Sequence, residues 1–362
     1  MSEAREITGI QYLRGYAAAA VVVAHANGML GADKYSGVRP LGEIKNLGGT
    51  GVVLFFLISG FIMPYIALRP RSLAPATTTS EFLWRRFARV VPFLWVCIVA
   101  WVALRVAGRG PAAWTEYWPG YLRAFVLWPT GFIDPPQAWT LRHEMFFYLL
   151  FSCTLMSWRG RFLPLLFWIL SPLLLLPFMA PSPVHRWDLL SVLAHSSNLL
   201  FGFGLLCGYT YLRFPRLFAV SVPGGSLTCL ILWILAICVA TTWRIKGDFS
   251  DALILGAICL PLVYAGICSK PSRYQRIDRA AYLIGDASYS IYMIHGIVIA
   301  SSLSVAALFV PWADPFALLV FCLVASIALG IWVHRNIELP LVRFFKRLGR
   351  SRGTAQTEPH PS

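Results

Sequence analysis

Ten apolar segments recur along this chain and constrain its fold more than any other feature. A membrane-spanning helix needs roughly 20 mostly apolar residues, and a soluble domain of 362 residues has too little interior for a chain that is 57% apolar. Disorder is excluded because disordered chains are poor in apolar residues. The sequence therefore predicts an all-α, polytopic membrane protein with about ten transmembrane helices, near residues 10–30, 48–68, 90–107, 143–157, 162–180, 189–212, 225–243, 251–268, 283–304 and 315–334.

The net charge of +15 suggests a nucleic-acid binder until the cations are located. Ten spans place both termini on one side, and cytoplasmic termini leave 20 Lys and Arg residues in cytoplasmic segments against nine outside. Such an excess is the usual topology signal of membrane proteins. We therefore expect cytoplasmic termini and no nucleic-acid partner. Residues 1–348 should form one transmembrane domain, and residues 349–362 a disordered cytoplasmic tail.

Ionisable residues inside the first span are the strongest pointers to a site, because charge is costly within a bilayer. Arg14 and His25 are 11 residues apart, which at about 100° and 1.5 Å per residue puts them on one face of a helix, roughly 16 Å apart. A snorkelling arginine and a histidine bonded to a neighbouring helix are the alternatives. Their common face favours a functional role.

Glu144 stands at the edge of the fourth apolar segment and shares a helix face with Tyr148. A buried carboxylate needs a partner, and a histidine or arginine on another helix would serve. The alternative is that Arg142, His143 and Glu144 lie among wet lipid headgroups, a reading that suits the first two best.

Two further segments carry polar or small residues inside apolar runs. Ser288, Tyr292 and His295 recur at helical spacing and predict one polar stripe, either a hydrogen-bonded packing seam or a substrate contact. Ser59 and Gly60 would let the second helix bend or let a neighbouring helix approach closely.

Arg85, Arg86 and Arg89 lie at the mouth of the third span. Guanidinium groups bind phosphate in a fork, so this cluster suits a polyphosphate ligand; the positive-inside rule explains the same cations without a ligand. No CxxC or HExxH motif occurs, and the histidines are scattered, so we expect no metal site.

Taken in order, these segments resemble the acyltransferase-3 family of integral-membrane O-acyltransferases, and most of all its exopolysaccharide-production (ExoZ-type) subgroup. The resemblance covers roughly residues 7–345. It rests on the segments 10–14 with His25, 51–61, 82–92, 139–148, 288–295 and 337–340.

The resemblance implies a function and a set of site residues. Members of the family typically move an acyl group, often acetyl from acetyl-CoA, onto a carbohydrate. The family's first-helix arginine and histidine match Arg14 and His25, and its Arg-x-x-Arg motif matches Arg86 and Arg89. Its Phe-Phe-x-x-Ser-Gly motif matches Phe55, Phe56, Ser59 and Gly60. A bacterial inner (cytoplasmic) membrane is implied as the location.

These observations combine into a mechanistic hypothesis. The enzyme would be an O-acetyltransferase with acetyl-CoA as donor and a carbohydrate, possibly lipid-linked, as acceptor. His25 would act as general base or as transient acyl carrier, and Glu144 would steady its imidazolium. The phosphates of CoA, entering from the cytoplasm, would be held by Arg14, Arg85, Arg86 and Arg89. Two other classes remain open: a transporter or flippase of a lipid-linked sugar that uses the same polar residues, and a scaffold within a polysaccharide synthase complex.

Overall fold

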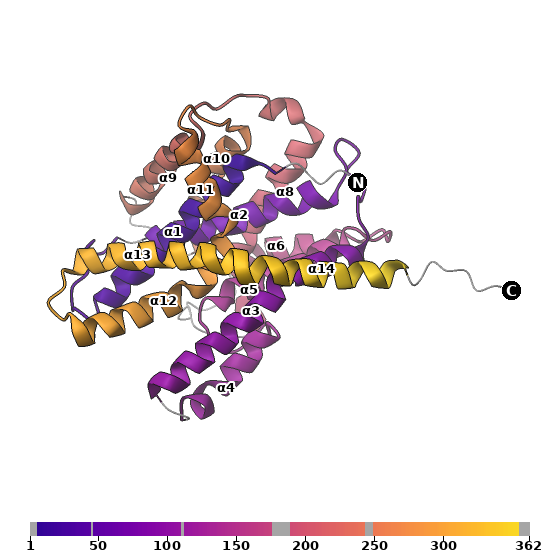
Figure 1. Cartoon of the computed structure of the whole chain (residues 1–362). Coiled ribbons are helices and arrows are strands. Elements are labelled where there is room, and N and C mark those ends of the chain that lie inside the picture. Colours follow the sequence, from indigo (N-terminus) through magenta and orange to yellow (C-terminus); the bar gives the residue numbers. More distant parts are fainter. Residues whose placement is uncertain (1–5, 45, 110–111, 176–188, 243–248, 355–362) are drawn as a thin grey trace.

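The computed structural model describes residues 6–44, 46–109, 112–175, 189–242 and 249–354, and over these ranges the chain is all-α (Figure 1). The helices are α1 (Thr8–Leu30), α2 (Leu47–Ala67), α3 (Thr79–Arg109), α4 (Ala112–Phe125), α5 (Ala138–Cys153), α6 (Leu163–Leu175), α7 (Leu189–Leu193), α8 (Ser197–Arg213), η2 (Pro215–Phe218), α9 (Gly225–Thr242), α10 (Phe249–Cys268), α11 (Gln275–Asp286), α12 (Ser288–Phe309), α13 (Pro315–Val333), the π-turn η3 (His334–Glu338) and α14 (Leu339–Thr354). This confirms the all-α class.

Six helical stretches in the described part are long and apolar enough to cross a membrane. They are Leu47–Ala67, Thr79–Gly108, Leu189–Arg213, Gly225–Thr242, Ser288–Phe309 and Pro315–Gly349. Helices satisfy their own backbone hydrogen bonds, which is what a bilayer demands of a spanning segment. Every one of the ten expected segments overlaps a helix in the described ranges, and the count of ten spans stays a prediction.

Three helix boundaries differ from those expected. α3 begins at Thr79 and not near residue 90, because the Thr78 hydroxyl accepts from the Glu81 backbone N–H and caps the first turn. The arginine cluster is therefore helical. The ninth apolar segment is interrupted at Ala287, between α11 and α12. α14 continues to Thr354, past the start of the expected tail at 349, and residues 355–362 lie outside the described ranges.

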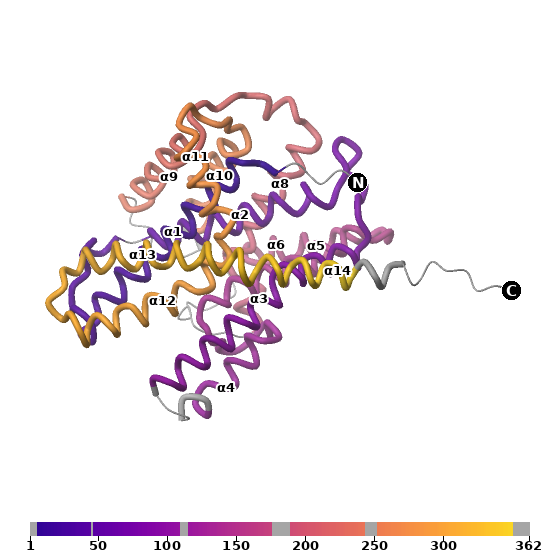
Figure 2. The backbone as a smooth tube through the Cα atoms, in the orientation of Figure 1, coloured from indigo at the N-terminus to yellow at the C-terminus, as the bar shows by residue number. Residues whose placement is uncertain are grey.

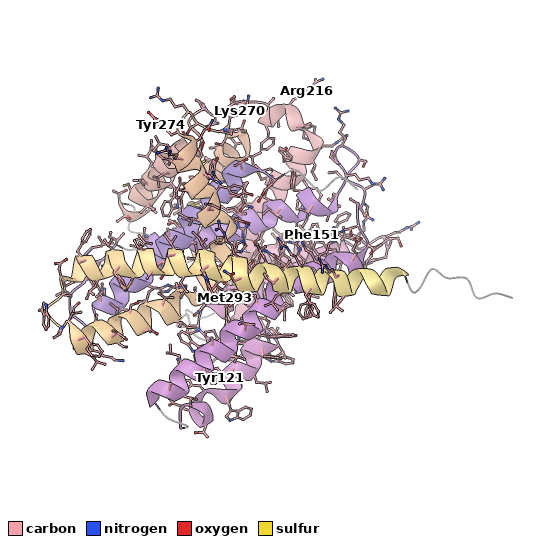
Figure 3. All side chains as sticks on the ribbon, viewed as in Figure 1. Tyr121, Phe151, Arg216, Lys270, Tyr274 and Met293 are labelled. Atoms are coloured by element: carbon pink, nitrogen blue, oxygen red, sulfur yellow. The ribbon has the colours of Figure 1, made fainter. Side chains whose placement is uncertain are left out.

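α1 lies at the centre of the fold. It packs against α2, α9, α10, α11, α12 and α13; of its two predicted site residues, Arg14 is partly buried and His25 is exposed. The backbone trace shows α13, η3 and α14 running on as one long rod, while α3 and α4 form a hairpin that projects from the rest (Figure 2). In Figure 3, Phe151 and Met293 lie within the bundle, and Arg216 and Lys270 project from one edge of it.

α2 and α8 approach each other through glycines. A Cβ atom on Gly60 would lie 2.3 Å from the Phe201 carbonyl oxygen, and one on Gly204 would lie 2.0 Å from the Leu57 carbonyl oxygen. Small residues allow such backbone contact between membrane helices. The close approach expected at Gly60 is thus confirmed, and it fixes the position of the neighbouring Ser59.

Candidate active site

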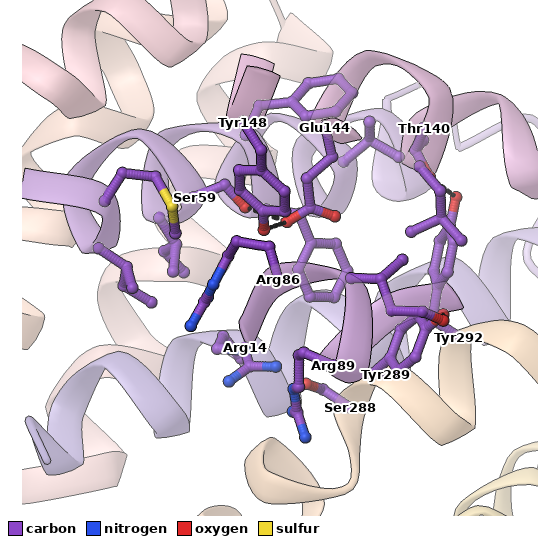
Figure 4. A pocket seen from close by; sticks show the side chains of 18 residues that line it. Arg14, Ser59, Arg86, Arg89, Thr140, Glu144, Tyr148, Ser288, Tyr289 and Tyr292 are labelled. Atoms are coloured by element: carbon purple, nitrogen blue, oxygen red, sulfur yellow. Dashed lines mark hydrogen bonds between the residues drawn. The ribbon is translucent and has the colours of Figure 1, made fainter. Parts of the chain in front are cut away.

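A cavity of about 190 Å³ lies where α1, α2, α3, α5 and α12 meet (Figure 4). Side chains from all five helices line it, although they are far apart in the sequence. Ten residues singled out from the sequence are among them: Arg14, Phe55, Phe56, Ser59, Arg86, Arg89, Glu144, Tyr148, Ser288 and Tyr292. Five separate segments of the sequence therefore converge on one space.

Glu144 is the carboxylate of this cavity. Its Oε1 accepts a hydrogen bond of 2.8 Å from the Ser59 hydroxyl and a second, short one from the Tyr148 hydroxyl. The Tyr148 bond follows from the i, i+4 spacing noted in the sequence. Because a hydroxyl from α2 and another from α5 share this oxygen, Glu144 ties the two helices together across the cavity.

Guanidinium groups line the side of the cavity opposite Glu144 (Figure 4). Arg86 lies over the Tyr148 ring, 5.8 Å from its centroid, and Arg14 donates from Nη1 to Gln11 Oε1 on its own helix at 3.1 Å. Both cations interact electrostatically with the Glu144 carboxylate. One carboxylate thus faces two cations, which leaves positive charge for an anionic ligand.

Two buried polar atoms of the cavity wall have no hydrogen-bond partner within the described ranges. They are the Nε atom of Arg86 and the hydroxyl oxygen of Ser288. Buried polar groups are nearly always satisfied by protein, water or ligand. The Arg86 Nε–H and the Ser288 hydroxyl can both donate, so they fit a ligand that carries oxygen acceptors, as a phosphate or a thioester carbonyl does.

Arg89 is held by a buried network that the sequence analysis missed. Its Nη1 donates to Glu338 Oε1 at 2.6 Å, and Glu338 Oε2 accepts from Ser290 Oγ at 2.6 Å. His334 bridges the two acids, with Nδ1 at 2.8 Å from Glu338 and Nε2 at 3.2 Å from Asp286. Glu338 is fully buried. The signal was a histidine and a glutamate at i, i+4 at the end of the last apolar segment, where the chain forms the π-turn η3; such turns are frequent at functional sites.

His25 does not line the cavity. It lies farther along α1, where its Nδ1 is 3.0 Å from Nε2 of His295. The His295 ring is buried and lies beside the Tyr292 ring of the cavity wall, with centroids 5.7 Å apart. The polar stripe of α12 therefore runs from Ser288 and Tyr292 in the cavity to His295 at His25.

A second hollow, of about 310 Å³, lies next to His25 along α1. Its lining combines Ala24, Asn27 and Gly28 of α1 with Arg39 and Glu43 of the segment that follows. The Asn27 amide donates to the Gly42 carbonyl at 3.0 Å and so fixes that segment over the helix. His25 thus stands on α1 between Arg14 in the cavity and Gly28 in the hollow.

Several predicted residues have other surroundings than expected. Within the described part of the chain, Glu144 bonds to Ser59 and Tyr148 and not to His25. Arg85 pairs with Glu81 on the surface and does not line the cavity, because α3 turns Arg86 and Arg89 inward.

Arg142 and His143 are not among headgroups. Their exposed fractions are 1% and 0%, so the expectation of a wet setting was wrong for both. Because α5 begins at Ala138, both residues lie in its second turn, inside the bundle. The rings of Trp139 and His195 pack around His143, with centroids 5.6 and 4.6 Å away.

Comparison with known proteins identifies the family of the chain. Residues 7–335 match the model of an acyltransferase domain, the acyltransferase-3 domain. The chain is 30% identical to the exopolysaccharide production protein ExoZ of Rhizobium meliloti, over 83% of this chain and 92% of that protein. It is 27% identical to the acyltransferase MdmB of Streptomyces mycarofaciens, over 97% and 94%, and 26% identical to nodulation protein 10 of Rhizobium leguminosarum bv. viciae, over 91% and 92%. No solved structure matches the chain.

Proposed function

Because the chain belongs to the acyltransferase-3 family of membrane acyltransferases, we propose that it moves an acetyl group from acetyl-CoA to a hydroxyl group of an exported or cell-surface carbohydrate. The observation that carries the proposal is the cationic cavity that ends beside the Tyr292 ring, next to the His25–His295 pair. The relative named for exopolysaccharide production supports a carbohydrate acceptor.

The cavity suits the donor. Arg14, Arg86 and Arg89 offer guanidinium groups from α1 and α3, and guanidinium recognises phosphate bidentately. A volume of about 190 Å³ holds only part of a CoA molecule, so the remainder extends beyond the mouth of the cavity. In this arrangement Glu144 fixes the Ser59 and Tyr148 hydroxyls and balances part of the positive charge.

The acceptor would reach His25 from the second hollow. Asn27, Arg39 and Glu43 give this hollow hydrogen-bond donors and acceptors, which suit the hydroxyl groups of a sugar. Donor and acceptor would then approach His25 from opposite directions along α1. The cytoplasm would lie on the Arg14 side, in a bacterial inner membrane.

The chemistry is acyl transfer from sulfur to oxygen. His25 removes the proton of the acceptor hydroxyl while the hydroxyl oxygen attacks the thioester carbonyl. The C–S bond then breaks, and the CoA thiolate leaves and takes up the proton from His25. In a second route the imidazole nitrogen itself attacks the thioester, CoA leaves, and the acetyl group passes from His25 to the hydroxyl. Both routes need an unprotonated nitrogen on His25.

The test is acetyl transfer by the purified protein in vesicles, with radiolabelled acetyl-CoA and candidate glycans. We expect free CoA and acetylated glycan in equal amounts, and at least a 100-fold loss of turnover in His25→Ala. Near-normal turnover of that variant sinks both routes. Movement of a lipid-linked sugar without acetylation would instead identify a flippase. Labelled acetyl retained on the protein without acceptor separates the covalent route from the direct one.

A further inference from the structure

We propose that His295 is a positioning residue that holds the His25 imidazole in one tautomer, with Nδ1 protonated and Nε2 free to react. The inference rests on the proposed function, since it names the residue that prepares its base. It concerns a part of α12 that the cavity does not include, and it applies equally to the direct and the covalent route.

The geometry between the two rings is that of a nitrogen-to-nitrogen hydrogen bond. His25 Nδ1 and His295 Nε2 are 3.0 Å apart, and the ring planes are inclined by only 24° with centroids 4.9 Å apart. In a neutral histidine one ring nitrogen donates and the other accepts. A hydrogen bond between two neutral imidazoles therefore requires that one of these two atoms carries the proton and the other does not.

The direction of the bond follows from the other side of the His295 ring. Its Nδ1 lies 2.5 Å from the Tyr292 carbonyl oxygen, which can only accept. Nδ1 of His295 therefore carries the proton, and its Nε2 is the acceptor. His25 must then donate from Nδ1, which leaves the lone pair on its Nε2.

The position of His295 is itself fixed. Its exposed fraction is 2%, and the amide of Gln137, the residue just before α5, donates to the carbonyl of Met293 at 2.9 Å. One turn away, the Tyr292 hydroxyl bonds to Thr140 at 3.0 Å. These bonds anchor the segment of α12 that carries His295 to α5 and its N-terminus. Turning the His295 ring away from His25 would break the bond of its Nδ1 to the Tyr292 carbonyl.

The chemical consequence is that His25 presents a single reactive atom. An imidazole free to choose places its proton on either nitrogen, and only one tautomer has its lone pair at the reacting position. After His25 has taken a proton at Nε2, its Nδ1–H still donates to His295, so the orientation survives the reaction. A fixed tautomer of this kind is worth up to about 10⁴-fold in kcat in the Ser-His-Asp enzymes, where the third group is an aspartate.

The test compares two substitutions of similar size. His295→Gln keeps an acceptor oxygen near the position of Nε2, and His295→Leu keeps volume without any acceptor. We expect His295→Leu to lose 10- to 100-fold in kcat with an unchanged KM for acetyl-CoA, and His295→Gln to stay within a few-fold of the parent. A merely structural role for His295 predicts the opposite order, because leucine suits an apolar interior better.

A second measurement does not depend on turnover. Alkylation with iodoacetate marks the unprotonated nitrogen of His25, and amino-acid analysis distinguishes the Nε2 and Nδ1 products. We expect the Nε2 product from the parent and from His295→Gln, and a mixture from His295→Leu. An unchanged product ratio in His295→Leu overturns the inference. A changed ratio in a protein whose His25→Ala variant keeps full turnover supports the inference and overturns the proposed function instead.

Discussion

The guanidinium of Arg89 on α3 donates to the carboxylate of Glu338 in η3 over 2.6 Å, which ties a cation of the cavity to the point where α13 passes into α14. The carboxylate side chain is fully buried, and Ser290 and His334 occupy its other oxygen. Removing this carboxylate leaves the buried Ser290 and His334 and the partly exposed Arg89 without their acceptor, and breaking a buried pair from one side is costly.

Glu338→Ala should therefore destabilise the fold by about 3–5 kcal/mol. Glu338→Gln should cost less, because its amide oxygen still accepts a hydrogen bond. Thermal unfolding of the purified protein in detergent measures both. The matched control is Glu81→Ala, which removes an ion pair of Arg85 whose side chains are 41% and 44% exposed; exposed pairs contribute about 0–1 kcal/mol. Equal unfolding temperatures for Glu338→Ala and Glu81→Ala would contradict the prediction.

A neighbouring pair of arginines tests donor binding. Arg86→Gln should raise the KM for acetyl-CoA about 10- to 100-fold, since hydrogen bonds to charged groups contribute roughly 1.5–3 kcal/mol. Arg85→Gln, one residue earlier but outside the cavity, should leave this KM unchanged. Steady-state kinetics with varied acetyl-CoA decide the matter. A similar rise in the KM for acetyl-CoA in both variants would mean that the arginines do not bind the donor specifically and act only as a topology signal.

The sequence predicts much of this site because its signals are local. Apolar runs mark helices, and spacing alone puts Tyr148 on the face of Glu144 and Ser288 on the face of Tyr292. The family motif pairs Arg86 with Arg89, and both line the cavity. Arg85 and Arg89 also share a helix face at i, i+4. Which of these faces turns inward depends on packing against other helices, and the spacing of residues along the chain gives no information about that packing.

The partners of the ionisable groups could not be predicted, because they come from distant parts of the chain. Glu338 meets Arg89 across 249 positions, and His295 meets His25 across 270. Nothing local distinguishes these contacts from the one expected between Glu144 and His25. The burial of Arg142 and His143 was missed for a related reason: α5 begins at Ala138, and the residues that pack around its second turn, such as His195, come from a distant part of the chain.

The contact between α2 and α8 predicts a sharp difference between two glycines. Gly204→Ala would put its Cβ 2.0 Å from the Leu57 carbonyl oxygen and must push the helices apart; overpacking of this kind costs about 1–3 kcal/mol or more. Gly28→Ala meets no atom within 4 Å, and alanine is favoured over glycine in a helix by about 1 kcal/mol. We expect a lower unfolding temperature for the first and an equal or higher one for the second. A stable Gly204→Ala protein would refute the close approach.

Asp278, on α11 outside the candidate spans, predicts a dependence of stability on pH. Burial raises the pKa of its carboxyl group, but hydrogen bonds from Ser226 and Ser272 outweigh this and hold the pKa below its ordinary value. A lowered pKa in the folded state stabilises the fold above the unfolded value of about 3.9 and stops doing so as the pH falls through the folded value. The unfolding temperature should therefore drop below about pH 4, and Asp278→Asn should lower it at neutral pH while weakening this drop. A parallel pH curve for both proteins would exclude Asp278 as a cause.

Gly28 also offers a direct test of where the acceptor binds. Open space lies beyond its Cα, on the side of the hollow formed with Arg39 and Glu43. A large side chain there would fill the hollow without disturbing the helix packing, and it would leave the distant Arg14 cavity intact. Gly28→Trp should therefore raise the KM for the glycan at least 10-fold at an unchanged KM for acetyl-CoA, whereas Gly28→Ala should change neither. Kinetics with each substrate varied in turn measure both constants. If Gly28→Trp transfers acetyl groups with the parent's glycan KM, the acceptor reaches His25 by another path, and the hollow has no part in recognising it.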